Sequence, residues 1–208
     1  MGSLRFWRYG LWAFLVIVGC VSLVKYQLGK IPAAFVDSKP SHGHANIGGV
    51  FTLTDQYGNT RTNDEFRGKL MLVYFGYSYC PDICPLGLQN MSKAIDLLQK
   101  DRDQVVPIFI TIDPKRDTVE NLKLHASNFH PSFVMLTGPQ DQIDGVSKAY
   151  RVYAATAPND GTTDYLMDHS TMIYIMDRNG AFVQQFPHTV DPEVLAKVLQ
   201  KCLFSPKP

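Results

Sequence analysis

Two cysteines separated by three residues are the part of the sequence best suited to chemistry. Cys80 and Cys84 belong to the segment Cys-Pro-Asp-Ile-Cys-Pro, which follows a long apolar run. Backbone amides at the start of a helix favour a thiolate over a thiol, and the thiolate is the form that attacks or binds metal. The pair therefore predicts either a site for one soft metal ion or a redox disulfide between Cys80 and Cys84.

A histidine farther along the chain supplies a candidate third ligand. A structural zinc site uses four ligands, whereas two thiolates and one imidazole suit copper as Cu(I) or Cu(II). His169 precedes the apolar strand pattern 173–175, and we expect it in a loop that faces the two cysteines. Asp168 is predicted to accept a hydrogen bond from the imidazole or from the local backbone.

The elements around the cysteines are predicted from apolar patterns. Continuous apolar runs at 70–75 and 105–112 indicate buried strands, and the run at 86–100 between them has a helical period. A strand, helix and strand in this order predict parallel strands joined by a right-handed crossover. Pro85 disfavours a helix that starts much earlier, so we expect regular helix from about Pro85 and a turn over Cys80–Cys84. Pro107 is expected early in its strand or at a sheet edge.

The remaining patterns complete an α/β fold. A hairpin is expected near 51–58, and a second hairpin with a turn at Asp160-Gly161 is expected as an insertion within 152–166. Further helices are predicted at 118–128, at 140–150 and from 191 onward, and further strands at 133–136, 171–176 and 181–186. This order predicts a thioredoxin-like mixed sheet with an N-terminal hairpin and an inserted hairpin.

The first thirty residues differ from the rest in charge and hydropathy. Residues 9–28 form an apolar segment whose length matches a bilayer, with Arg5 and Arg8 before it. Positive charges stay on the cytoplasmic side, so the following domain is expected outside. The predicted organisation is a cytoplasmic segment 1–8, a transmembrane anchor 9–28, a linker 29–47 and a copper-binding domain 48–208.

Two other interpretations of the N-terminal segment also export the domain. A signal peptide cleaved near Ala33-Ala34 is one, and lipidation at Cys20, in Ile17-Val18-Gly19-Cys20, is the other. His42 and His44 are expected to be solvated linker residues, with an auxiliary metal site as the alternative.

Composition excludes two broad classes of protein. Of 20 Lys and Arg and 19 Asp and Glu, four basic residues and no acid lie in the first thirty positions, so the remainder is weakly acidic. Such a domain is poorly suited to binding nucleic acid, which requires many contacts from basic side chains to phosphates. Four cysteines in 208 residues also exclude a small disulfide-stapled scaffold.

Four motifs occur in a specific order: Cys80-Pro-Asp-Ile-Cys84-Pro, Asp113-Pro-Lys-Arg-Asp-Thr118, Ala149-Tyr-Arg-Val-Tyr153 and Asp168-His-Ser-Thr171. Together they resemble the Sco family of copper chaperones for cytochrome c oxidase assembly, over about 48–186. The resemblance implies that Cys80, Cys84 and His169 bind one copper ion. It also implies a thioredoxin-like metallochaperone, not an enzyme.

The same resemblance implies partners and a location. The expected target is the dinuclear copper site of cytochrome c oxidase subunit II. The resemblance implies that the protein delivers copper to this site, reduces its cysteines, or does both. Another copper chaperone and a thioredoxin-like reductant are further expected partners. Since no long Arg-rich presequence is visible, a bacterial inner-membrane protein with a periplasmic domain is expected.

Other candidate residues are expected to have structural roles, with functional roles as the alternative. Asp113, Arg116 and Asp117 are expected to close a loop by ion pairing and to precede a helix cap at Thr118, with contact to copper or a partner as the alternative. Cys202 is predicted to be a buried thiol. Core packing is predicted for four methionines, in preference to a copper relay: Met135, Met167, Met172 and Met176.

Two alternative functions remain open at this stage. In an exported thiol–disulfide oxidoreductase, Cys80 would attack, Cys84 would resolve, and no metal would be essential. His169 separates this function from copper binding, because thiol exchange does not need the imidazole. A peroxiredoxin-like peroxidase is a weaker candidate. That chemistry usually places a hydroxyl side chain three residues before its cysteine, and position 77 here is Tyr.

Overall fold

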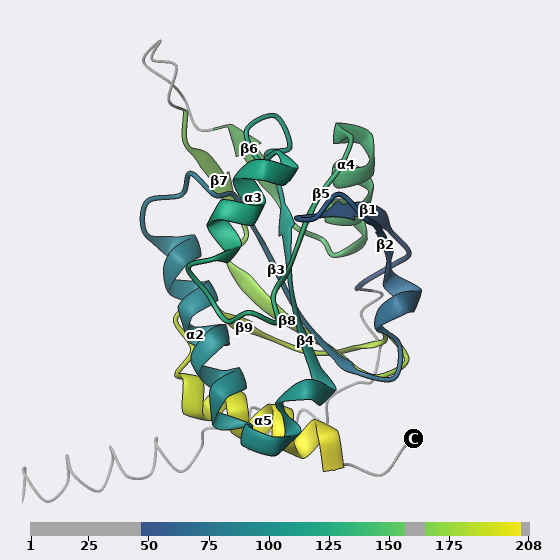
Figure 1. The fold of residues 1–208 in the computed structure, drawn as a ribbon, viewed down its shortest axis with the longest axis vertical. Helices are drawn as coiled ribbons and strands as arrows, with labels where there is room; N and C mark the ends of the chain where they lie inside the picture. Colours follow the sequence, from purple (N-terminus) through teal and green to yellow (C-terminus); the bar gives the residue numbers. More distant parts are fainter. Residues whose placement is uncertain (1–46, 157–164, 205–208) are drawn as a thin grey trace, which may run out of the picture. The chain divides into compact units, whose positions relative to one another are not determined.

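A computed structural model describes residues 47–156 and 165–204, which form a mixed β-sheet with helices packed on it (Figure 1). Within those ranges, no helix combines the length and apolarity needed to cross a bilayer. The predicted anchor and linker, with Cys20, His42 and His44, lie outside the described residues, as does the predicted turn at Asp160-Gly161.

Seven strands form the main sheet in the order β2-β1-β5-β4-β3-β8-β9. The strands are β1 (Thr52–Asp55), β2 (Thr60–Thr62), β3 (Leu70–Gly76), β4 (Val105–Thr111), β5 (Val134–Thr137), β8 (Met172–Met176) and β9 (Phe182–Pro187). The sheet is parallel across β3, β4 and β5, and antiparallel at both sides of that centre. This arrangement confirms the predicted α/β, thioredoxin-like mixed sheet.

The centre of the sheet follows the predicted strand–helix–strand unit. β3 and β4 pair in parallel from Leu70 opposite Val105 to Gly76 opposite Thr111, and α2 (Ile83–Leu97) joins them. Every residue of β3 is buried, as a strand covered on both faces requires. Pro107 is tolerated because pairing of β4 with β5 begins only at Ile108, so this part of β4 has a ladder on one side.

Helices cover both faces of β3. Successive strand residues point to opposite faces, and Tyr74 packs near Gly87 of α2 while the ring of Phe75 lies 5.2 Å from that of Tyr150. Tyr150 directly follows α4 (Gln140–Ala149), so α2 and α4 lie on opposite sides of the strand. The remaining helices are α3 (Val119–Ala126), α5 (Pro192–Phe204) and the short 3₁₀ segments η2 (Asn63–Phe66) and η3 (Gln99–Gln104).

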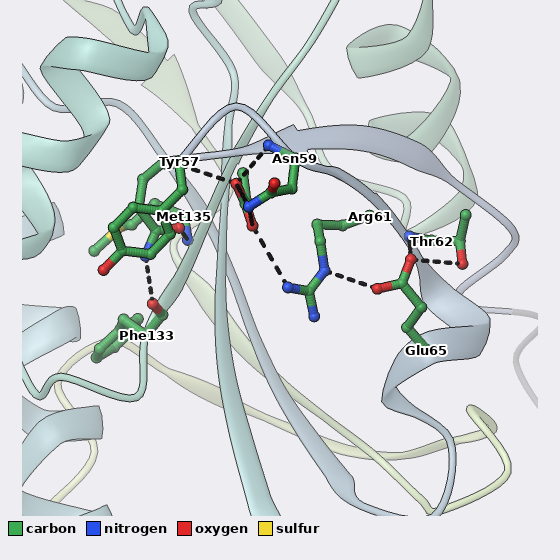
Figure 2. Close-up of polar contacts among 9 residues, drawn as sticks. Tyr57, Asn59, Arg61, Thr62, Glu65, Phe133 and Met135 are labelled. Carbon is green, nitrogen blue, oxygen red and sulfur yellow. Dashed lines mark hydrogen bonds and ion pairs between the residues drawn. The ribbon is translucent and has the colours of Figure 1, made fainter.

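Polar contacts close the turn of the N-terminal hairpin and join the hairpin to β5 (Figure 2). The carboxylate of buried Asp55 accepts hydrogen bonds from the backbone amides of Tyr57 and Asn59, both at 2.9 Å. The side chain of Gln56 donates to the carbonyl oxygen of Phe133 and accepts from the amide of Met135, also at 2.9 Å. Gln56 thus takes the place of a backbone partner for the start of β5.

The inserted hairpin is confirmed, but its position differs from the prediction. β6 (Ala154–Thr156) pairs antiparallel with β7 (Met167–His169), and these two strands form a sheet of their own. The return strand therefore lies beyond the predicted limit of 166.

The predicted burial of Cys202 is wrong, because its position on α5 leaves the side chain half-buried.

Candidate metal centre

Cys80 and Cys84 lie across the start of α2. Cys80 occupies a turn in which its amide donates to the carbonyl oxygen of Tyr77, and Cys84 is the second residue of the helix. The helix begins at Ile83, earlier than the predicted start near Pro85. Pro85 fits there because the first turn of a helix has no intrahelical acceptors for its amides, so the missing N–H costs nothing.

His169 reaches the cysteines from the inserted hairpin. It is the last residue of β7, paired with Ala154, and not a loop residue as predicted. Its Nε2 lies 3.4 Å from Sγ of Cys84, and its Nδ1 lies 3.0 Å from the carbonyl oxygen of Ser170. A proton on Nδ1 donated to that carbonyl leaves the Nε2 lone pair facing the sulfurs.

Asp168 does not have the predicted role toward the imidazole. Neighbouring residues of a strand point to opposite faces, and Asp168 is exposed while His169 is half-buried. The carbonyl of Ser170 takes the place that the prediction gave to the Asp168 carboxylate.

The three potential ligand atoms form a compact cluster. Sγ of Cys80, Sγ of Cys84 and one imidazole nitrogen of His169 all lie within 4.8 Å of one another. It is the one such group of three or more cysteines, histidines or acids in the part of the chain that the structure describes. Two soft sulfurs and one nitrogen fit copper better than zinc, whose structural sites take four ligands.

The two sulfurs have unequal acidities. A hydrogen bond from Cys84, with further ones from nearby backbone amides, outweighs burial and lowers the pKa of Cys80 to about 3. The neighbouring Cys80 sulfur and burial both raise the pKa of Cys84 above its ordinary range. These opposite shifts favour a Cys80 thiolate beside a Cys84 thiol in the reduced pair.

Three residues at the end of β3 line the site beside the imidazole and the sulfurs, and the sequence did not predict them. The rings of Tyr74 and Tyr77 meet the His169 imidazole edge-on, with centroids 6.4 and 5.9 Å away. Gly76 provides space for a sulfur, since a Cβ there would lie 2.8 Å from Sγ of Cys84. A glycine at the end of a buried strand is the signal that predicts such a close approach.

The acidic and basic residues of the second motif connect loops beside the cysteines. Asp113 forms an ion pair with Arg116. Asp117 is buried and accepts hydrogen bonds from Ser78, two residues before Cys80, and from the Thr111 hydroxyl, the latter at 2.6 Å. Thr118 caps α3 by accepting from the amide of Asn121. The predicted ion pair between Asp113 and Arg116 and the predicted helix cap are therefore present, whereas Asp117 closes the loop through hydrogen bonds and not through an ion pair.

The methionines belong to the hydrophobic core, as predicted. Met135 and Met176 are fully buried, and Met167 and Met172 are partly buried against the same core. The ring centre of His125 lies 5.8 Å from that of Phe109 and 5.1 Å from that of Phe129.

Comparison with known proteins points to one family. A family model described as SCO1/SenC matches residues 39–203. The chain is 41% identical over 170 residues to a SCO2-like protein of Rickettsia felis, covering 78% of this chain and 83% of the relative.

Two solved structures have the same fold and carry copper. ScoI of Bradyrhizobium japonicum with copper bound is 43% identical, has a TM-score of 0.71, and aligns with 75% of this chain and 99% of its own. Yeast Sco1 with copper bound is 39% identical, has a TM-score of 0.72, and aligns over 78% and 91%.

Proposed function

The chain belongs to the SCO1/SenC family, and from that premise we propose that it binds one copper ion through Cys80, Cys84 and His169. We propose further that it is a metallochaperone which delivers this copper to the dinuclear site of cytochrome c oxidase subunit II. The observation that carries the proposal is the convergence of two sulfurs and one nitrogen within 4.8 Å.

The donor set suits a copper ion that must be both held and released. Thiolates favour Cu(I), and an imidazole nitrogen extends the site to Cu(II). The pKa of Cys80 is lowered to about 3, so this sulfur offers its thiolate without losing a proton on binding. Cys80 is also the more accessible residue, with 8% of its surface exposed against none for Cys84, so exchange with a partner's ligands is expected to begin there.

Copper titration tests this function directly. The reduced chain is expected to bind one copper ion, and the chain oxidised to a Cys80–Cys84 disulfide is expected to bind none, because both thiolates are consumed. The loaded chain should then transfer copper to an apo copper domain of subunit II. Full copper loading of the disulfide form would contradict the proposal.

One observation favours thiol–disulfide exchange as a second function. A Cys80 thiolate beside a Cys84 thiol is the state needed to reduce a disulfide in a partner. Cys80 would attack the target disulfide and release one target thiolate. Cys84, losing its proton, would then displace the second, so the target gains two electrons and a Cys80–Cys84 disulfide forms. A thioredoxin-like reductant would restore the dithiol.

His169 separates the two functions. His169→Ala removes the nitrogen ligand and keeps both sulfurs, so a copper chaperone should lose its Cu(II)–thiolate absorption and fail to support oxidase assembly. Changing a residue that is only hydrogen-bonded to a metal ligand typically weakens binding by about 10–100-fold, so loss of the ligand itself should weaken Cu(II) binding by at least that factor. A thiol exchanger should still reduce the target's cysteines. Normal oxidase assembly by the variant under copper limitation would favour the exchange function.

We also propose that residues 9–28 anchor the protein in the bacterial inner membrane with its copper-binding domain in the periplasm. The apolar segment after Arg5 and Arg8 supports this topology. In that compartment the domain would meet subunit II, another copper chaperone and a thioredoxin-like reductant.

A further inference from the structure

The guanidinium of Arg116 lies where three segments meet beside the cysteines. These are the segment before Cys80, the loop after β4 that holds Arg116 itself, and the segment that leads into β7. We propose that Arg116 is a positioning residue: it holds the β6–β7 hairpin so that the His169 imidazole reaches the two sulfurs. This inference rests on the proposed function for its consequence, which is copper binding with nitrogen ligation.

Arg116 contacts the segment that leads to His169 directly in two ways and is joined to it a third time through Asp113. Its Nη1 donates to the carbonyl oxygen of Tyr165 at 2.9 Å, and its Cζ lies 3.7 Å from the centre of the Tyr165 ring. Its Nε pairs with Asp113, whose other carboxylate oxygen accepts from the Tyr165 hydroxyl at 2.8 Å. Arginine, carboxylate and tyrosine thus form a closed set of contacts, and both ends of the Tyr165 residue are held.

The same guanidinium contacts the residues that precede Cys80. Its Cζ lies 5.5 Å from the centre of the Tyr77 ring and 4.9 Å from that of Tyr79, within the range of cation–π attraction. The Tyr77 hydroxyl in turn accepts from the amide of Met167 at 3.2 Å, and the Tyr77 ring meets the His169 imidazole edge-on. Arg116 therefore joins the cysteine turn to Tyr165, and Tyr77 adds contacts with Met167 and His169 farther along the same segment.

The hairpin needs such support because the main sheet does not hold it. Among the residues that the structure describes, β7 has three residues and pairs with β6, which also has three, in a sheet separate from the seven-stranded one. Short two-stranded ribbons are only marginally stable without further packing. The C-terminal side of His169 leads directly into β8, and the contacts of Arg116 fix the other side.

Geometry, and not charge alone, is expected to matter at this position. The side chain of Arg116 is 17% exposed and uses a planar group both to donate to a carbonyl and to stack on a ring. A lysine keeps the charge but offers neither the fork of donors nor the flat face. Arg116→Lys should therefore behave like Arg116→Met, and not like the parent.

The first test needs no metal. Hydrogen exchange of the Met167 amide in the reduced, copper-free 208-residue chain should accelerate by about tenfold in Arg116→Met and Arg116→Lys, because the hairpin opens more often. Lys115→Met is the matched control: it removes the same charge one residue away, at an exposed position, and should exchange like the parent. Equal exchange in the parent and Arg116→Met, or parental exchange in Arg116→Lys, would overturn the proposal.

The second test reads the imidazole itself. In the Cu(II)-loaded chain, Arg116→Met should weaken the nitrogen hyperfine splitting in electron paramagnetic resonance and lower Cu(II) affinity by about 10–100-fold, with both cysteines still titratable. Faster exchange with an unchanged nitrogen signal would overturn positioning of His169. A parent chain that binds no copper would refute the proposed function instead, while the exchange experiment would still decide how the hairpin is held.

A milder variant keeps the test decisive if Arg116→Met fails to fold. Tyr165→Phe removes only the hydroxyl that donates to Asp113 and keeps the ring under the guanidinium. Exchange at Met167 should change in the same direction by a smaller factor. No change in both Tyr165→Phe and Arg116→Lys would overturn the proposal.

Discussion

At the residue scale, the surroundings of the two cysteines differ enough to predict which sulfur reacts. The pKa of Cys80 is lowered to about 3, chiefly by the hydrogen bond from Cys84, whereas the pKa of Cys84 is raised. An ordinary thiol with a pKa of about 8.5 becomes about tenfold less reactive for each unit of pH below that value. Alkylation of Cys80 by iodoacetamide should instead stay nearly constant from pH 8 to pH 5.

Mass spectrometry of the reduced, copper-free chain measures that profile cysteine by cysteine. Cys202 is the internal control. Burial raises its pKa, so its alkylation rate should fall steeply as the pH is lowered. If Cys80 alkylation also falls about tenfold for each unit of pH, its thiolate is not stabilised as described.

Gly76 gives a second prediction at this scale. Gly76→Ala would place a Cβ 2.8 Å from Sγ of Cys84 and 3.0 Å from Cε2 of Phe109, both in the packed core. Overpacking of this kind should lower the free energy of unfolding by about 1–3 kcal/mol and displace the sulfur. Urea unfolding and copper titration measure the two effects.

Gly145→Ala is the matched control for Gly76→Ala. Gly145 lies in α4, and a Cβ there meets no atom within 4 Å beyond the backbone of its own helix among the described residues, so alanine should stabilise the protein by up to about 1 kcal/mol through helix propensity. Equal stability of Gly76→Ala and the parent would show that the space beside Cys84 is not needed.

At the scale of elements, the side chain of Gln56 joins the N-terminal hairpin to β5 through two hydrogen bonds (Figure 2). Gln56→Ala leaves the buried carbonyl of Phe133 and amide of Met135 without partners. Each buried polar group left unpaired costs about 1–3 kcal/mol, so the free energy of unfolding should fall by at least that amount.

Denaturant unfolding compares Gln56→Ala with Gln185→Ala, an exposed glutamine in β9. The control should change stability by no more than about 0.5 kcal/mol, as surface substitutions usually do. Similar stabilities for both variants would mean that the two hydrogen bonds of Gln56 contribute little.

Elements with a strong periodic pattern were predictable from sequence, and those fixed by tertiary contacts were not. The apolar runs of β3 and β4 and the helical period of α2 gave the central parallel unit, which the structure confirms. Pro85 predicts a start for α2 that is too late, because proline is disfavoured inside a helix but is accepted in the first turn, where it lies. β7 is not predictable because three residues carry no readable alternation, and the segment is held by Tyr77 and Arg116, which are distant in sequence.

The same distinction applies to the site. Cys80, Cys84 and His169 could be proposed together because thiols and imidazoles have few roles at such positions, and the fold brings them within 4.8 Å. The contacts of Arg116 with Tyr165 could not be predicted, because they join residues 49 positions apart through a side chain and a backbone carbonyl.

At the scale of the whole molecule, the proposed function requires the copper-binding domain to lie outside the cytoplasm. Arg5 and Arg8 precede the apolar segment, so residues after 28 are predicted to be periplasmic. A reporter enzyme that works only in the periplasm, fused after Pro208, should be active. Activity of a cytoplasm-only reporter at the same position would contradict both the topology and copper delivery to an exported target.

The most direct test of the central claim is X-ray absorption spectroscopy of the copper-loaded, reduced chain beside its His169→Ala variant. Cys80, Cys84 and His169 as ligands predict two sulfur scatterers and one imidazole nitrogen around a single copper ion in the parent. In the variant, the imidazole contribution should disappear and both sulfurs should remain. Identical spectra for the two proteins, or a copper environment with fewer than two sulfurs, would contradict the account.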